Sequence, residues 1–166
     1  MSDRVVENKT EEDSRPYRQG VGLMIFNREG RVFVGNRIDY PSDNWQMPQG
    51  GIDPGETPRT TAMRELEEEI GTSKAEIIAE SQFWYYYDLP ATISRQAWAG
   101  KFRGQKLRWL AMRFTGMDQD ICLDAHEAEF NAWQWVNVDE LSTLIVPFKR
   151  EMYEQLVQEF GAIVVF

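Results

Sequence analysis

The sequence predicts an α/β fold in which a mixed β-sheet lies between helices, and three observations lead to this prediction. First, apolar runs with the alternation typical of strands are separated by segments with helical periodicity. Second, the turn sequence at residues 27–30 joins two of these runs closely enough for an antiparallel hairpin. Third, strands interrupted by helices favour a mixed sheet with helices packed against it. The clearest strand-like runs are residues 21–27, 31–37, 105–116 and 130–138.

A helix is predicted at residues 58–70, directly after a loop rich in proline, aspartate and glycine. Thr57 suits the N-cap, Pro58 suits the first helical position, and Gly71 can close the C-terminus. At about 100° per residue, one stripe of this helix is apolar and a different face is acidic. The apolar stripe consists of Ala62, Leu66 and Ile70.

The remaining segments complete the predicted domain. The aromatic run at residues 81–89 is typical of a strand whose rings belong mainly to the core. Residues 138–145 predict a short helix, and residues 147–164 predict an amphipathic C-terminal helix. The polar residues 1–15 predict a flexible tail, whereas residues 16–166 predict a single folded domain.

Composition limits the classes of partner. The chain has 166 residues and a formal net charge of −9, so a broad attraction to nucleic acid or to anionic membranes is not expected. We therefore expect no stable DNA partner and no membrane association, and the sequence identifies no protein partner. The single cysteine, Cys122, excludes an internal disulfide and is predicted to be a buried thiol. These features predict a cytoplasmic protein whose anionic ligands are held by local basic groups or bound cations.

The acidic face of the helix raises a physical question. Glu65, Glu68 and Glu69 lie at i, i+3 and i+4, where like charges destabilise a helix by about 0.2–0.5 kcal/mol per pair. Negative charge near the C-terminus also opposes the helix dipole. Clustered carboxylates are hard oxygen ligands, so bound Mg²⁺ or Mn²⁺ would turn their repulsion into shared coordination. A merely solvated face is the alternative, but it does not explain the glycine-rich sequence before the helix.

This segment resembles the Nudix box. Gly50, Glu56 and the run from Arg64 to Gly71 match fixed positions of that motif, and only Thr72 replaces its usual aliphatic last residue. Other stretches between residues 16 and 165 are similar to the bacterial Nudix branch that acts on RNA 5′ ends and on dinucleoside polyphosphates. These stretches are YR and VG within 17–22, WQMPQGGI at 45–52, GQKLRW at 104–109, EFNAWQWV at 129–136 and FKREMYEQLVQEF at 148–160.

The resemblance implies the Nudix α/β/α sandwich and a helix that binds divalent cations, with Mg²⁺ expected and Mn²⁺ or another cation able to substitute. One glutamate of the site would also act as the general base. A salt bridge between Glu56 and Arg64 would brace the loop against the helix, although Glu56 could instead reach a metal through water. The implied metal-binding and catalytic residues are Glu65, Glu68, Glu69, Glu129 and, through its carbonyl, Gly50.

The resemblance also implies residues that bind the substrate. Arg18, Arg37 and Lys149 would bind phosphates, and Phe148 would stack on a nucleobase. Considered without the resemblance, the two arginines could be ordinary surface charges. Lys149 could equally belong to a helix surface, and Phe148 could belong to the core.

The implied activity is hydrolysis of a phosphoanhydride by a water that bound cations activate. One substrate is a 5′-triphosphate RNA end, converted to a 5′-monophosphate to initiate mRNA decay. The other is a dinucleoside polyphosphate such as diadenosine tetraphosphate, split into ATP and AMP, and the residues do not separate the two. A non-catalytic Nudix nucleotide sensor is the alternative of another class, but no box carboxylate is lost. A P-loop nucleotidase and a di-iron protein lack their sequence signatures here.

Overall fold

The structure is a computed structural model that describes residues 13–39 and 44–163. Its strands are β1 (Tyr17–Phe26), β2 (Val32–Arg37), β3 (Gln49–Gly51), β4 (Ala75–Glu80), β5 (Tyr85–Asp88), β6 (Gly104–Phe114) and β7 (Phe130–Val136). Its α-helices are α1 (Pro58–Ile70), α2 (Ala91–Ser94), α3 (Leu141–Leu144) and α4 (Arg150–Phe160). Short 3₁₀ turns are η1 (Ala97–Gly100), η2 (Asp118–Asp120), η3 (Val138–Glu140) and η4 (Pro147–Lys149).

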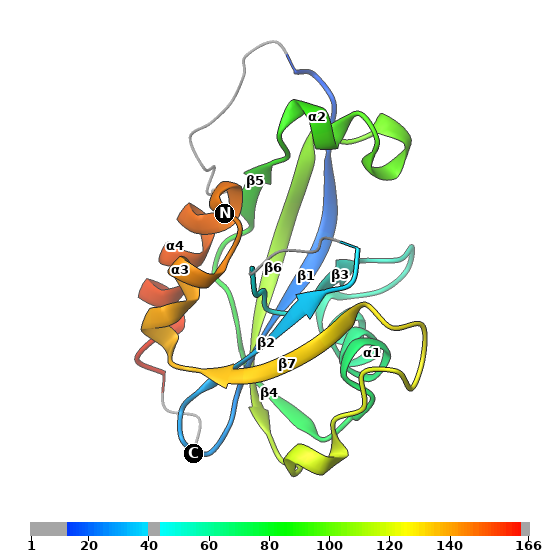
Figure 1. Ribbon diagram of the computed structural model, residues 1–166. Coiled ribbons are helices and arrows are strands. Elements are labelled where there is room, and N and C mark those ends of the chain that lie inside the picture. The colour runs from blue at the N-terminus through cyan, green and yellow to red at the C-terminus, as the bar shows by residue number, and fades with distance from the viewer. Residues whose placement is uncertain (1–12, 40–43, 164–166) are drawn as a thin grey trace.

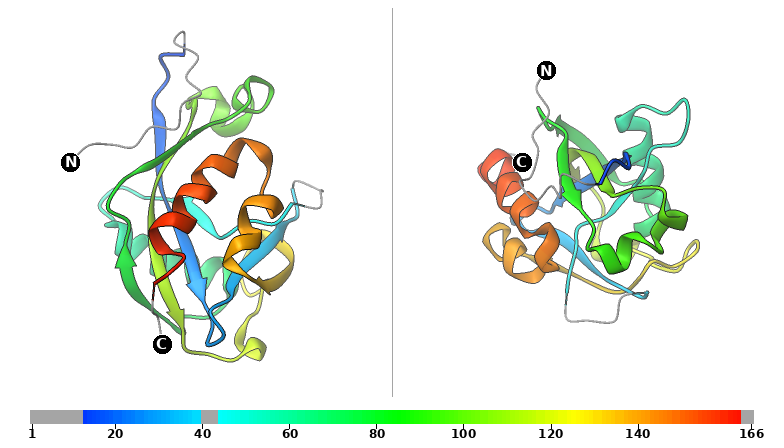
Figure 2. Two further views of the ribbon diagram at one scale, coloured as in Figure 1. Left: turned by 90° about the vertical axis from the view of Figure 1, so that its left-hand side faces the viewer. Right: turned by 90° about the horizontal axis from the view of Figure 1, so that it is seen from above.

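The described strands form one mixed sheet of seven strands, with the main order β4-β6-β1-β2-β7. Strand β1 pairs in parallel with β6, whereas its pairings with β2 and β3 are antiparallel. Figure 1 shows α1 on one face of the sheet and α3 with α4 on the other, and Figure 2 shows the same layers from two further sides. This arrangement confirms the predicted α/β fold with a mixed sheet between helices.

Each face of the sheet has its own apolar core. Under α4, Trp109 of β6 meets Tyr153 edge to face, with ring centroids 5.9 Å apart. Under α1, Leu66 and Ile70 pack with Leu23 of β1, and all three are at most 1% exposed. The apolar stripe predicted for the helix is therefore the face that packs on the sheet.

Local interactions fix both ends of α1. Thr57 and Thr60 form a reciprocal cap, because the Thr60 N–H donates to Thr57 Oγ1 at 3.2 Å and the Thr57 N–H donates to Thr60 Oγ1 at 2.9 Å. Gly71 ends the helix with φ 79°, a left-handed conformation that glycine adopts without steric penalty. The cap fixes where the acidic face begins, so α1 runs over the residues predicted for it.

Other boundaries differ from the sequence prediction. Strand β1 begins at Tyr17, before the predicted run at 21–27, and the C-terminal helix begins as the 3₁₀ turn η4 and ends at Phe160. Strands β3 and β4 are absent from the prediction. The three residues of β3 sit in a glycine-rich loop without alternation, and β4 is mostly half-buried with a glutamate near each end.

The prediction of a buried thiol at Cys122 is wrong, because the side chain is exposed and its Sγ lies 3.2 Å from Asp124 Oδ1. The backbone of this residue is what packs: its N–H donates to the Ile70 carbonyl at 2.7 Å, at the end of α1. Of the expected tail at 1–15, residues 1–12 lie outside the described residues, and Arg15 contacts Ser94 at the end of α2 and Gly100 beyond it. No helix of the described residues is long and apolar enough to cross a membrane.

Candidate active site

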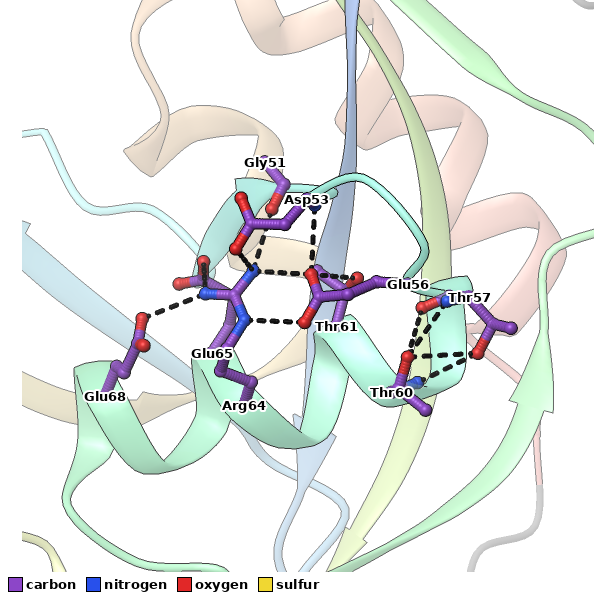
Figure 3. Close-up of polar contacts among 9 residues, drawn as sticks. All are labelled: Gly51, Asp53, Glu56, Thr57, Thr60, Thr61, Arg64, Glu65 and Glu68. Carbon is purple, nitrogen blue, oxygen red and sulfur yellow. Dashed lines mark hydrogen bonds and ion pairs between the residues drawn. The ribbon is translucent and has the colours of Figure 1, made fainter.

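Arg64 is the centre of a network that joins α1 to the loop before it (Figure 3). Its Nε and Nη2 donate to the two carboxylate oxygens of Glu56, each at 2.8 Å. Its Nη1 donates to Glu65 Oε1 at 3.0 Å and to Glu68 Oε2 at 3.1 Å, and Nη2 also donates to the Gly51 carbonyl at 3.0 Å. The salt bridge that the resemblance implies between Glu56 and Arg64 is therefore present, and the same guanidinium orients two glutamates of the acidic face.

Two glutamates of this face are buried without full compensation of their charge. Glu65 is 8% exposed and Glu69 is 2% exposed. Burial raises the pKa of Glu65 to about 7, against the opposing charge of Arg64 and with the negative charges of Glu68 and Glu129 adding to the rise. Burial, together with the charges of Glu65 and Glu129, raises the pKa of Glu69 well above its usual value. In the metal-free protein these two carboxyl groups therefore keep their protons to a higher pH than ordinary glutamates do.

The other expected ligands surround this pair. Glu68 and Glu129 are exposed, and the charge of Glu129 acts on both buried carboxylates. The Gly50 backbone lies directly against Glu65, since a Cβ at that glycine would fall 2.1 Å from Glu65 Cδ. Glu67, the remaining glutamate of the run, is exposed, and none of the hydrogen bonds and ion pairs that Arg64 makes within the described residues involves it.

These carboxylates do not converge on one point. Within residues 13–39 and 44–163, no group of three or more His, Cys, Asp or Glu side chains is arranged to hold a metal ion. Arg64 Nη1 instead lies 3.0 Å from Glu65 Oε1 and 3.1 Å from Glu68 Oε2, so a guanidinium occupies the space between these two carboxylates. The donor set nevertheless suits a divalent cation, because Glu69 Oε2 is buried without a hydrogen-bond partner among the described residues.

A cavity of about 630 Å³ lies on the sheet face that η4 covers. Three of the four residues expected to bind substrate line it, namely Arg37, Phe148 and Lys149. Phe148 is half-buried, and its ring centroid lies 6.0 Å from that of Tyr87. The Arg37 guanidinium pairs with Asp39, its Nε donating to Oδ1 at 2.8 Å. The cavity thus combines aromatic walls with cationic groups, a combination suited to a base and its phosphates.

Lys149 is only 4% exposed, so it is not an ordinary surface lysine. Burial lowers its pKa to about 7, and the nearby charge of Arg37 acts in the same direction. The charges of Asp39 and Glu69 act in the opposite direction, so the ammonium lies within electrostatic reach of the carboxylates on α1. Lys149 Nζ also donates to Gln49 Oε1 at 3.2 Å, and the next residue, Gly50, lies against Glu65, so the cationic cavity and the acidic helix are neighbouring parts of one site.

A chain of hydrogen bonds joins Lys149 to Arg18, the fourth expected substrate-binding residue. Lys149 Nζ donates to Gln49 Oε1 at 3.2 Å, and Gln49 Nε2 donates to the Tyr87 hydroxyl at 3.1 Å. Gln105 Nε2 donates to the same hydroxyl at 2.6 Å, and Arg18 Nη1 donates to Gln105 Oε1 at 3.4 Å. Neutral side chains thus separate the two cations and hold them in place.

Sequence reasoning does not identify Gln49, Tyr87 and Gln105 as site residues. The aromatic run that contains Tyr87 is typical of core, and Tyr87 is indeed 2% exposed. Gln49 and Gln105 do lie within stretches that resemble the Nudix branch, and this was the available signal. Only the pairing of β3 with β1, of β1 with β6 and of β6 with β5 brings both amides to the Tyr87 hydroxyl.

The fold and the site define an α/β/α sandwich protein with an acidic helix beside a cationic, aromatic cavity. The chain belongs to the NUDIX family, because its residues 16–156 match the NUDIX domain. It is 53% identical over 149 residues to the RNA pyrophosphohydrolase of Rickettsia peacockii, covering 90% of this chain and 92% of that one. The RNA pyrophosphohydrolase of Rickettsia prowazekii is 52% identical with the same coverage.

Solved structures support the fold. The dihydroneopterin triphosphate pyrophosphohydrolase of E. coli is similar with a TM-score of 0.64 and 22% identity, covering 87% of this chain and 99% of that chain. The Ap4A hydrolase of C. elegans is similar with a TM-score of 0.60 and 17% identity, again covering 87% and 99%. At these identities the likeness concerns the sandwich and not the substrate.

Proposed function

We propose that this chain is an RNA 5′-pyrophosphohydrolase, which converts 5′-triphosphate RNA ends to 5′-monophosphate ends. The observation that carries the proposal is the position of Lys149, which lines the cavity and donates to Gln49 Oε1 at 3.2 Å, beside the Gly50 backbone that lies against Glu65 of α1. A nucleotide in the cavity would thereby extend its phosphates toward α1. The RNA substrate is supported by the 52–53% identity to the rickettsial enzymes, and it implies a cytoplasmic role in mRNA decay.

Nudix enzymes generally use divalent cations, and we propose Mg²⁺, with Mn²⁺ as a substitute, for this chain. The residues proposed to hold them are Glu65, Glu68, Glu69, Glu129 and the Gly50 carbonyl. When bound, such cations neutralise phosphate charge and make water more acidic. The buried Glu65 and Glu69 carboxylates supply the negative charge that attracts the cations, and Arg64 keeps Glu65 and Glu68 oriented.

The side chains divide the remaining work. Arg18, Arg37 and Lys149 are proposed to bind the phosphates, and Phe148 is proposed to stack on a base. In the reaction, a water oxygen bonds to the α-phosphorus while the bond from that phosphorus to the bridging oxygen breaks. The two outer phosphates leave, and a carboxylate of the acidic set accepts the proton of the water.

The test compares two substrates with matched variants. Purified protein and Mg²⁺ are incubated with 5′-triphosphate RNA or with diadenosine tetraphosphate, and 5′-monophosphate RNA or ATP and AMP are measured. We expect cleavage of the RNA by wild type and by Glu67→Gln, whose exposed residue is outside the site, and loss of cleavage in Glu68→Gln. Cleavage of diadenosine tetraphosphate alone would show that the dinucleotide, and not RNA, is the substrate. Cleavage of neither compound would favour a non-catalytic nucleotide sensor. Full activity of Glu68→Gln would refute the assignment of that glutamate.

A further inference from the structure

The chain between α2 and β6 contains a turn with an uncommon backbone conformation. Trp98 has φ 48° and ψ 40°, and Ala99 has φ 56° and ψ 29°. Among the described residues, these two are the non-glycine residues with positive φ. Non-glycine residues reach this region at an energetic cost, because Cβ approaches the following carbonyl oxygen. Such a turn persists only where its surroundings hold it in place.

Arg15, which precedes β1, holds this turn at both ends. Its Nη1 donates to the Gly100 carbonyl at 3.2 Å and to the Ser94 carbonyl at 3.3 Å, and its Nη2 donates to Ser94 Oγ at 3.0 Å. Asp13 orients the guanidinium by accepting from Nε at 2.9 Å and from Nη2 at 2.7 Å. Figure 1 shows α2 and the turn beside the ends of β1 and β6. The turn is therefore tied to the sheet.

The turn places the Trp98 indole over the guanidinium of Arg18, with Cζ 5.0 Å from the ring centroid. The backbone of β3 touches the same guanidinium, since a Cβ at Gly51 would lie 2.1 Å from Arg18 Nη2. Gln105 accepts from Nη1 at 3.4 Å, and within the described part of the chain Arg18 forms no ion pair. Neutral groups hold this cation, so its charge is available to an anionic ligand.

Trp98 also lines the cavity of about 630 Å³. The indole could therefore contact a ligand directly or act through Arg18. The contact of the ring face with a cation favours action through Arg18, since that contact is formed without any ligand. An arginine already held in its binding orientation loses less side-chain freedom when a phosphate arrives.

We propose that Trp98 is a positioning residue, which holds Arg18 in the orientation that binds substrate phosphate. The proposal rests on the proposed function for the role of Arg18. The left-handed turn and its Arg15 anchor are the means by which the chain brings an indole to that point. Trp98 acts through the guanidinium, so its contribution exists only while Arg18 is present.

A kinetic double-mutant cycle tests this dependence. On 5′-triphosphate RNA, Trp98→Ala should raise KM about tenfold and change kcat less than about twofold, whereas Trp98→Phe should recover most of the loss because it keeps a ring face. In the Arg18→Ala background, Trp98→Ala should cause no further change. An equal rise of KM in both backgrounds would show that Trp98 acts on the substrate or on the fold, and would overturn the proposal.

Trp84 supplies a matched control. Its ring also contacts cations, with Lys106 Nζ 5.2 Å and Arg108 Cζ 4.9 Å from the ring centroid. Trp84 is half-buried, but it does not line the cavity. Trp84→Ala should leave KM unchanged. A rise of KM equal to that of Trp98→Ala would mean that a general loss of packing explains both effects, and it would contradict the proposal.

A second readout does not depend on activity. The Nε–H resonance of Arg18, assigned by its disappearance in Arg18→Ala, should be displaced by the ring current of Trp98 and should move to the range of exposed arginines in Trp98→Ala. A resonance that Trp98→Ala leaves in place would contradict the proposed contact. If wild type fails to cleave RNA, the proposed function fails, while this resonance still decides whether Trp98 holds Arg18.

Discussion

Glu56 and Arg64 form a two-pronged ion pair, in which Nε and Nη2 of the arginine each lie 2.8 Å from a different oxygen of the carboxylate. Because the same guanidinium reaches Glu65 and Glu68, the pair connects the loop before α1 to the acidic face of that helix. Paired geometry of this kind is specific to arginine, since lysine offers a single charged centre.

The pair predicts a pH-dependent contribution to stability. Its hydrogen bonds with Arg64 lower the pKa of Glu56 to about 2. A lowered folded pKa means that the stabilisation is present above the ordinary value near 4.5 and is lost as pH falls toward 2. Glu56→Gln should therefore have a lower urea midpoint than wild type at pH 6, and the difference should narrow at pH 3. Glu67→Gln should show no such trend, and a constant difference for Glu56→Gln would contradict the assignment.

Glu65 and Glu69 predict the opposite pH dependence for the metal-free protein. Burial raises the folded pKa of Glu65 to about 7, so the stability that this group contributes below about 4.5 is lost as pH rises through 7. The folded pKa of Glu69 is raised as well, so its contribution is also lost as pH rises. In the presence of a metal chelator, the free energy of unfolding of wild type should be lower at pH 8 than at pH 5 by an amount on the order of 2 kcal/mol. The double variant Glu65→Gln with Glu69→Gln should lack this difference. Urea unfolding at both pH values measures this difference.

Added Mg²⁺ should reverse that loss. At about 100 times its dissociation constant, a cation that binds only the folded protein stabilises it by about 2.7 kcal/mol. The melting temperature at pH 8 should therefore rise with Mg²⁺ concentration in wild type. It should stay constant when Glu65, Glu68 and Glu69 are all changed to glutamine. An equal shift in both proteins would place the cation elsewhere.

Substitutions of two glycines are expected to have contrasting effects, one on the geometry of the site and the other on the stability of the fold. Alanine at Gly50 would place Cβ 2.1 Å from Glu65 Cδ and displace that carboxylate, so Gly50→Ala should lower kcat at least about 100-fold with a modest loss of stability. Alanine at Gly30 meets no atom within 4 Å but must adopt φ 76°, so Gly30→Ala should cost about 1 kcal/mol and leave activity unchanged. Steady-state kinetics and urea unfolding of both variants measure the contrast.

Lys149 predicts a pH-dependent role in binding. Burial lowers its pKa to about 7, so the fraction that is charged falls as pH rises through 7. Lys149→Met should raise KM for 5′-triphosphate RNA about tenfold at pH 6 but less than about threefold at pH 9. Arg37→Met should raise KM by the same factor at both pH values, because arginine keeps its charge. A pH-independent effect of Lys149→Met would contradict the lowered pKa.

The fold class and the extent of α1 could be predicted because local signals agree there. Thr57, Pro58 and Gly71 mark the ends of the helix, and the apolar stripe of Ala62, Leu66 and Ile70 has a single period. The short strand β3 could not be predicted, because its pairing with β1 depends on residues far apart in the sequence. The exposure of Cys122 was missed for a related reason, since its backbone and not its thiol meets the end of α1.

The salt bridge between Glu56 and Arg64 could be predicted because the motif fixes the spacing of these residues along the chain. What the spacing does not give is how the other residues of the site meet in space. The chain of hydrogen bonds through Tyr87 and the contact between Trp98 and Arg18 join strands and turns that are distant in sequence. Burial of Lys149 likewise depends on the packing of η4 over β5 and not on its neighbours in the sequence.

We propose that buried carboxylates of α1 make this chain a cation-dependent RNA pyrophosphohydrolase, and substitution of Glu69, which is 2% exposed, tests this proposal directly. The measurement is the rate of 5′-monophosphate formation from 5′-triphosphate RNA as Mg²⁺ is titrated, in wild type, Glu69→Gln and Glu67→Gln, each verified to be folded at the assay temperature. We predict a saturable Mg²⁺ dependence in wild type and Glu67→Gln, and a rate at least about 100-fold lower in Glu69→Gln. A Glu69→Gln rate equal to wild type, or cleavage that persists in chelator, would contradict the account.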